Sequence, residues 1–167
     1  IIQQNPKLSP QFIFVHPGYN MRNTEVGAVI GLNQLKSLDK NNRSRIRNFK
    51  FFLDNLNQSK YRTDFDLRGN CNYSFPVILK KASFNDWKKL SSTLKNKKIE
   101  YRKGNAGGGN QLRQPYLKNF RKKYNLKNFK QVDHIHFFSC YIGNYPSLNT
   151  KKIKKICSIL NSINYER

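Results

Sequence analysis

Cysteine is scarce in this 167-residue sequence, and the three that occur, Cys71, Cys140 and Cys157, share no recognisable spacing. Their odd number argues against a disulfide framework, and without a CxxC or Cys/His pattern they predict no metal site. Long apolar runs are missing as well, since no stretch approaches the roughly 18 residues of a membrane-spanning helix, and the first residues have no signal-peptide pattern. We therefore expect reduced thiols, a cytoplasmic location and no membrane partner.

Signature motifs of several enzyme classes are also missing. The sequence contains no Gly-x-Ser-x-Gly elbow and no catalytic Cys/His signature. It has neither the Gly-Lys-Ser/Thr of a P-loop nor a GxGxxG that opens a helix after a strand. These absences argue against a serine or cysteine hydrolase, a P-loop nucleotidase and a dinucleotide-binding domain.

Acidic residues are few. Nine Asp and Glu stand against 32 Lys and Arg, which gives a formal net charge of +23. A charge of this size favours polyanions, so a basic nucleic-acid-binding module without catalysis is one interpretation. However, the charge is spread over most of the expected helices, and the many Lys, Asn and Ile residues are typical of A/T-rich coding. We therefore expect nucleic acid not to be the partner.

Apolar residues do occur in patterns that predict helices. Hydrophobic residues make up 37% of the chain, enough for one domain with a core. Helical spacing predicts helices over 24–38 and 41–56, one that Ser83 caps, and one that Asn149 or Thr150 caps. The basic side of 41–56 is expected to face solvent.

Four short segments predict strands: 61–65, 73–79, 99–102 and 134–141. Pro76 in the second segment favours an edge position or a bulge, because proline cannot donate a ladder hydrogen bond. The order of elements predicts an α+β fold in which helices pack on a small, mainly antiparallel sheet.

The segment 104–114 reads Gly-Asn-Ala-Gly-Gly-Gly-Asn-Gln-Leu-Arg-Gln and is too glycine-rich for a helix or a strand. Its glycines would allow a close approach to an anion, which Arg102 and Arg113 could clamp. A flexible surface loop is the alternative, and the pattern leaves both open.

Two histidines, His134 and His136, alternate on an expected strand, which would place both rings on one face. Because no third ligand stands at a suitable spacing, we expect a histidine of the core or the substrate side and no metal.

One long motif resembles a known family. Residues 17–25 read Pro-Gly-Tyr-Asn-Met-Arg-Asn-Thr-Glu, and an Ala-Val-Ile-Gly-Leu stretch, Gln-Leu and Leu-Asp follow in order up to Asp39. This resembles the signature of the DegT/DnrJ/EryC1/StrS family of pyridoxal-phosphate enzymes, which aminate or deoxygenate nucleotide-linked keto sugars. Residues 107–116 and the segments 134–138 and 141–146 look like one branch of that family, in lipopolysaccharide biosynthesis.

The resemblance implies roles for individual residues. Asn20 would reach the cofactor phosphate of the neighbouring subunit in a homodimer, and Tyr19 and Arg22 would belong to the same rim. The sugar or its diphosphate would be faced by Asn110, Arg113, Gln114, His134 and His136.

The resemblance also implies the small C-terminal domain of a fold type I aminotransferase. Residues 1–23 would then be an arm with the GYN motif, 24–57 interdomain helices, and 58–167 the α+β domain. The Schiff-base residue would belong to a large domain that the sequence does not include, so we expect the fragment alone to be inactive, and a truncated product remains an alternative. For the complete enzyme we expect pyridoxal 5'-phosphate, a 4-keto-sugar nucleotide and an amino donor such as glutamate, with transamination favoured over 3-dehydration.

Overall fold

The computed structural model describes residues 1–21 and 23–165, with the side chains of residues 120–122 outside that description. Two helices come first, α1 (Glu25–Leu35) and α2 (Leu38–Asn55), and α3 (Phe84–Asn96) follows β1. Later come α4 (Lys130–Phe138) and α5 (Thr150–Asn161). The strands are β1 (Ser74–Ile78), β2 (Arg102–Lys103) and β3 (Ser139–Gly143). Four short 3-10 helices lie between β2 and α4: Ala106–Gly108, Gln111–Arg113, Pro115–Lys122 and Leu126–Phe129.

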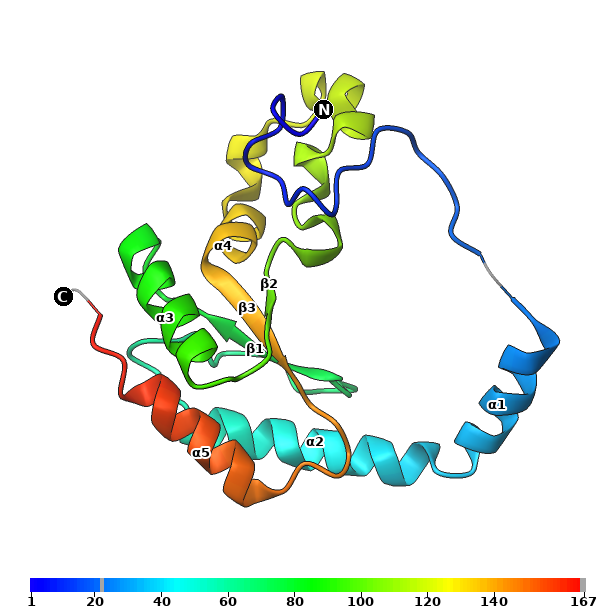
Figure 1. Cartoon of the computed structure of the whole chain (residues 1–167), viewed down its shortest axis with the longest axis vertical. Helices are drawn as coiled ribbons and strands as arrows, with labels where there is room; N and C mark the ends of the chain where they lie inside the picture. The colour runs from blue at the N-terminus through cyan, green and yellow to red at the C-terminus, as the bar shows by residue number, and fades with distance from the viewer. Residues whose placement is uncertain (22, 166–167) are drawn as a thin grey trace.

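The sheet has three antiparallel strands in the order β1-β3-β2. Inward residues of β1 and β3 face each other in register, Phe75 opposite Ile142 and Val77 opposite Cys140. Side chains from α2, α3 and α5 cover this face, and α2 and α5 lie side by side along it (Figure 1). The expected α+β fold is confirmed, and Pro76 stands on the edge strand β1, as its missing N–H requires.

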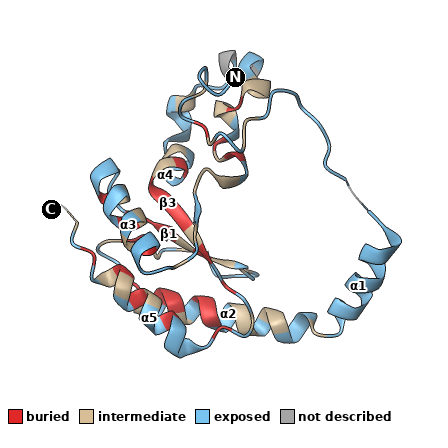
Figure 2. Ribbon diagram, viewed as in Figure 1, coloured by how far each residue is buried: buried red, intermediate tan, exposed pale blue. Residues whose placement is uncertain are grey.

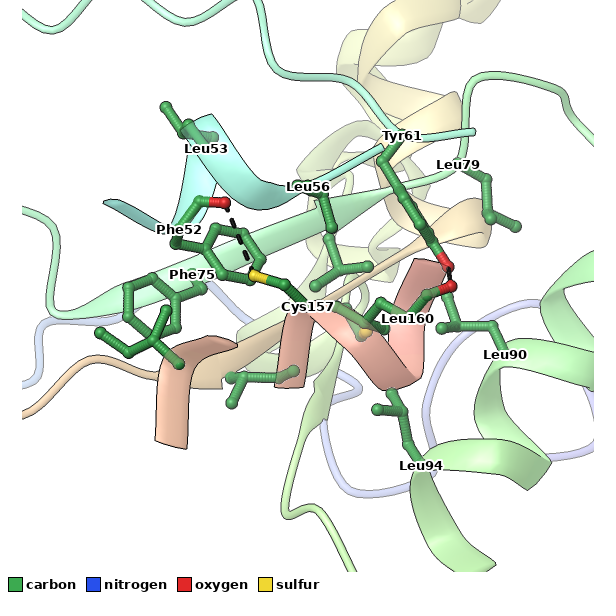
Figure 3. Close-up of a cluster of buried hydrophobic side chains, with 14 of the residues drawn as sticks. Phe52, Leu53, Leu56, Tyr61, Phe75, Leu79, Leu90, Leu94, Cys157 and Leu160 are labelled. Atoms are coloured by element: carbon green, nitrogen blue, oxygen red, sulfur yellow. Dashed lines mark hydrogen bonds between the residues drawn. The ribbon is translucent and has the colours of Figure 1, made fainter. Parts of the chain in front are cut away.

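The core is dominated by aromatic and branched side chains (Figure 3). The rings of Phe52 and Phe75 stack with centroids 4.5 Å apart. Tyr61 is fully buried, and its hydroxyl donates to the Leu160 carbonyl oxygen at 2.8 Å. Burial raises the pKa of Tyr61 far above its ordinary value, so the phenol stays protonated.

Helix capping follows the sequence closely. The Ser83 hydroxyl accepts from the Asp86 backbone N–H, and the Asn149 side chain accepts from the Lys152 N–H. In α1, Thr24 caps in the same way by accepting from the Gly27 N–H. Local side-chain hydrogen bonds therefore fix where these helices begin.

Three of the expected strands are wrong in extent. Segment 61–65 makes only an isolated bridge from Tyr61 to Leu79, and 99–102 contributes only its last residue to β2. Segment 134–141 is helical up to Phe138 and extended only from Ser139. The loose alternation of apolar residues there fits a helix as well as a strand, and packing decided between them.

The first helix differs from the others in burial. The expected helix 24–38 breaks after Leu35, and α1 has no buried residue (Figure 2). Its apolar residues are more than half exposed, for example Val26 at 71% and Leu32 at 66%. In contrast, α2 buries Phe49, Phe52 and Leu53, whereas its apolar residues Leu38 and Ile46, nearer its start, are exposed.

Candidate functional site

The N-terminal arm, residues 1–21, packs against the glycine-rich loop and the neighbourhood of α4 (Figure 1). Gln114 makes the main connection. Its Oε1 accepts from the Phe14 N–H at 2.9 Å, and its Nε2 donates to the carbonyl oxygens of Phe12 and Gly108, also at 2.9 Å. The Tyr116 N–H donates to the Phe14 carbonyl at 3.1 Å. The arm thus makes strand-like hydrogen bonds to the loop, and the Gln114 side chain supplies two of these three bonds to the arm.

His136 forms a second connection to the arm. Its Nδ1 accepts from the backbone N–H of Asn110 at 3.0 Å, and its Nε2 lies 3.0 Å from the Lys7 carbonyl oxygen. Because one nitrogen must accept and the other must donate, the ring is neutral with its proton on Nε2. Burial, together with the positive charge of Arg113, holds the pKa of His136 below its usual value.

A half-buried ion pair between Arg113 and Asp133 joins the loop to α4. Arg113 donates to Asp133 in bidentate fashion, Nε to Oδ1 at 2.7 Å and Nη2 to Oδ2 at 2.6 Å. Asn110 also donates to Asp133 Oδ1 at 2.7 Å, and the guanidinium lies 5.0 Å from the ring centre of Phe137. Burial opposes ionisation of Asp133, but the hydrogen bonds from Arg113 and Asn110 outweigh it and lower the pKa of the carboxyl group.

The glycines of the loop allow this close packing. Gly107, Gly108 and Gly109 all have positive φ, at 72°, 105° and 60°. A Cβ on Gly109 would collide with the His136 ring, and one on Gly108 would lie 2.7 Å from the Phe14 ring. The loop is therefore a packed element that touches the arm and α4, and its Asn110 N–H is taken up by His136.

A groove of about 530 Å³ opens beside this cluster. Arg113, Asp133 and His134 line it together with Phe137. The remaining lining residues include two exposed lysines, Lys127 and Lys130. The groove thus combines an aromatic surface with positive charge, which suits an anion attached to a ring system.

The structure divides the expected site residues into three groups. Arg113 and His134 line the groove, whereas the side chains of Asn110, Gln114 and His136 are almost fully buried in the network behind it. Tyr19 and Asn20 lie on the exposed end of the arm, Tyr19 at 94% exposure, and Arg22 lies outside the described residues.

The two histidines do not share a face, contrary to the sequence expectation. Because α4 is a helix, residues two apart point about 200° from each other. His134 therefore turns to the Leu79 carbonyl oxygen, and His136 turns to the arm.

Sequence reasoning missed Asp133. It organises Arg113 and Asn110, and its signal was its position three residues before His136, the spacing that places both on one side of a helix. The spacing of Asp133 and His136 has this meaning only if residues 130–138 are expected to form a helix.

Within residues 1–21 and 23–165, no group of three or more His, Cys, Asp or Glu side chains could hold a metal ion. In the same part of the chain, no helix is long and apolar enough to cross a membrane.

The comparison with protein families gives a clear result. Residues 3–161 match the DegT/DnrJ/EryC1/StrS aminotransferase family, and the chain belongs to this family. Two curated relatives are similar over much of the chain. The GDP-4-keto-6-deoxy-D-mannose 3-dehydratase of Escherichia coli O55:H7 (strain CB9615 / EPEC) is 32% identical over 102 residues, which are 60% of this chain and 26% of that protein. The lipopolysaccharide biosynthesis protein RfbH of Salmonella typhimurium (strain LT2) is 28% identical over 155 residues, 89% of this chain and 34% of that protein.

Solved structures give the same picture. An E. coli GDP-4-keto-6-deoxy-D-mannose-3-dehydratase with bound hydrated pyridoxal phosphate has a TM-score of 0.64 and 26% identity, covering 90% of this chain and 38% of that chain. A GDP-4-keto-6-deoxymannose-3-dehydratase with a trapped PLP-glutamate geminal diamine has a TM-score of 0.61 and 25% identity, covering 88% and 38%. The chain thus spans about a third of the length of these relatives, its fold is that of the small part of a pyridoxal-phosphate enzyme, and the cofactor of its family is pyridoxal phosphate.

Proposed function

We propose that this chain forms the small-domain portion of a pyridoxal-phosphate-dependent enzyme that acts on a nucleotide-linked 4-keto-6-deoxy sugar. The pathway would be the cytoplasmic biosynthesis of a cell-surface polysaccharide. The observation that carries the proposal is the arm: it is hydrogen-bonded at Phe14, and beyond that point Tyr19 and Asn20 are exposed to solvent. In this arrangement the residues of the family motif are free to serve a neighbouring subunit.

The division of the chain follows from the same proposal. Residues 1–23 form the arm, 24–57 the helices between domains, and 58–167 the α+β domain. The exposed apolar residues of α1 support this division, because an apolar surface of that kind is covered in a stable assembly. We propose a homodimer in which the arm of one subunit reaches the cofactor of the other.

The exposed residues of the arm fit the cofactor. An amide such as that of Asn20 supplies N–H donors, which phosphate oxygens accept strongly. When bound, pyridoxal phosphate provides the electron sink for chemistry beside the sugar carbonyl. Asn20 would hold its phosphate, with Tyr19 and Arg22 at the rim.

The groove beside α4 fits the diphosphate end of the sugar nucleotide. Lys127 and Lys130 lie at its edge and would attract the sugar diphosphate. Arg113 and His134 are the two residues of the expected substrate set that line this groove.

Two reactions are compatible with the family. Removal of the 3-hydroxyl is favoured, because one of the two curated relatives and the two solved structures described above carry that activity in their names. Transamination is the second candidate, since the family is described as aminotransferases. The glutamate adduct seen in one relative supports glutamate as the amino donor.

The test uses the intact protein that contains this chain. It is supplied with pyridoxal phosphate, glutamate and GDP-4-keto-6-deoxymannose, and the product is analysed by mass spectrometry. A product that has lost one oxygen indicates dehydration, and one that has gained nitrogen indicates transamination. Absence of both products, with the cofactor bound, would refute the proposed substrate.

The role of the arm is tested separately. Asn20→Ala should weaken pyridoxal-phosphate binding about tenfold to a hundredfold, as expected for a lost hydrogen bond to a charged group. Asn23→Ala is the matched control, because Asn23 is also exposed and Thr24 alone caps α1. Equal cofactor affinity in the two variants would contradict the assignment.

A further inference from the structure

Gln114 is the most completely buried polar side chain near the arm. Its relative exposure is 0%, and both ends of its amide are used by backbone groups. Its partners Phe14 and Phe12 lie 100 and 102 positions earlier in the sequence. Burying a polar side chain costs free energy unless its hydrogen bonds are made. Because Gln114 makes its bonds to such distant segments, few other side chains would fit this site.

The chemistry of the site requires an amide. The arm offers one N–H, from Phe14, and one carbonyl oxygen, from Phe12, and the loop offers the Gly108 carbonyl oxygen. A side chain that matches them must accept once and donate twice, which glutamine does. A glutamate of the same size would keep the acceptor, but would bring its second oxygen against two carbonyl oxygens.

The hydrogen bonds at Phe14 limit how far the following residues of the arm can move. Asn20 follows Phe14 by six residues, and six extended residues reach at most about 20 Å. The next connection towards the N-terminus is the bond between Lys7 and His136, thirteen residues before Asn20. Loss of the Gln114 contacts leaves Phe14 held by the backbone bond from Tyr116, and release of that bond too would double the length of chain between Asn20 and its nearest contact on the N-terminal side.

We infer that Gln114 is a positioning residue for the cofactor site: it clamps the arm at Phe14 and so confines Asn20 to the region in which it meets the cofactor phosphate. The inference rests on the proposed function of Asn20. It replaces the direct contact with the sugar that the family resemblance suggested for Gln114, because the side chain lies behind the groove and is fully buried.

The size of the effect on cofactor binding follows from the length of chain that tethers Asn20 to the rest of the domain. The effective concentration of a tethered group falls with about the 3/2 power of the tether length. Lengthening from six to thirteen residues therefore reduces it about threefold. Gln114→Glu should weaken pyridoxal-phosphate binding by about this factor, less than Asn20→Ala does, and combining the two substitutions should add nothing to Asn20→Ala alone.

The first experiment tests the clamp itself on the full chain by hydrogen exchange of the segment 11–16. Gln114→Glu should speed exchange of the Phe14 amide about tenfold or more at pH 8, because repulsion between the carboxylate and the carbonyl oxygens of Phe12 and Gly108 displaces the side chain from which that amide has its acceptor. Gln111→Glu is the matched control, since it makes the same chemical change three residues away at an exposed side chain. Unchanged exchange in Gln114→Glu would overturn the clamp.

A pH series adds a readout that general loss of structure would not give. A buried glutamate has a raised pKa, and its protonated form regains one donor. After correction for the intrinsic pH dependence of exchange, the protection of the Phe14 amide in Gln114→Glu should therefore return partly as the pH falls from 8 to 6.5. Gln114→Met, which cannot gain a proton, should show no such recovery.

The final experiment measures cofactor affinity and sugar-nucleotide KM on the intact protein. If Asn20→Ala leaves cofactor affinity unchanged, the proposed function of the arm fails, whatever Gln114 does. If Asn20→Ala weakens the cofactor but Gln114→Glu does not, the positioning role fails while the function stands. A raised KM for the sugar nucleotide in Gln114→Glu, with the exchange of Phe14 unchanged, would instead restore direct substrate contact and overturn the inference.

Discussion

Replacement of Asp133 by asparagine tests how far the half-buried ion pair holds the loop to α4. Asp133 accepts from Arg113 at two positions and from Asn110 at a third. The side chains of Arg113 and Asp133 are only 17% and 24% exposed. Asparagine keeps the shape of the side chain but turns one acceptor into a donor that faces the guanidinium. The side chain at position 133 can then no longer accept from both Nε and Nη2 of Arg113.

The expected loss of stability lies between two limits. Breaking a fully buried pair costs about 3–5 kcal/mol, and an exposed pair contributes about 0–1 kcal/mol. For a pair with this residual exposure we expect about 2 kcal/mol. With a typical urea dependence of about 2 kcal/mol per molar, the midpoint of unfolding should fall by about 1 M.

The protein offers a matched control. Asp66 and Arg68 form a pair of similar geometry, with Nη2 and Oδ2 2.7 Å apart, but their side chains are 61% and 91% exposed. Asp66→Asn should leave the urea midpoint unchanged at moderate salt. Equal midpoints for Asp133→Asn and Asp66→Asn would show that burial of the inner pair has no energetic consequence and would refute the reasoning.

Acid titration tests the same ion pair by protonating Asp133 instead of replacing it. The pKa of Asp133 lies below its usual value in the folded chain, so its contribution to stability is complete above about pH 4 and is lost as the pH falls through the lowered pKa. Asp133→Asn should therefore show a weaker loss of stability below pH 4 than the unmodified chain. A parallel acid slope in both proteins would contradict the ionised state of Asp133.

Two further predictions concern the same cluster. Gly109→Ala should destabilise the chain by more than about 3 kcal/mol in urea unfolding, since it combines a strained backbone with a collision at His136, whereas Gly107→Ala should cost only about 1–2 kcal/mol because its surroundings are open. Because the folded pKa of His136 is lowered, its contribution is complete above about pH 6.5 and declines as the pH falls through the lowered value. After correction for the intrinsic pH dependence of exchange, the protection of amides near Lys7 should therefore fall between pH 7.5 and 5, and His136→Gln should remove that loss of protection; a loss that persists in the variant would assign it to another group.

Several features of the fold could be predicted because they depend on neighbours in sequence. Ser83 and Asn149 cap helices through bonds to backbone groups three residues away, so their signal is local. Pro76 excluded a central strand by its chemistry alone. The family motif around Asn20 is likewise contiguous, and the matching family confirms it.

Other features could not be predicted, because residues far apart in the chain decide them. Segment 134–138 carries apolar residues that suit either periodicity, and the contacts of His134 with Leu79 and of His136 with Lys7 require a helix. The expected stripe of α1 suggested a buried face, but exposure depends on what packs against a helix and not on its pattern.

The sequence by itself determined the family, the α+β class and the starts of several helices, since motif order, composition and capping are properties of adjacent residues. Only the tertiary structure decided that the glycine-rich loop is packed against the arm and that Gln114 lies behind the groove, because its partners Phe12 and Phe14 are about a hundred residues away. It also decided that Asp133 joins Arg113 and Asn110, since three polar groups become one network only when a helix and a loop bring them within hydrogen-bonding distance.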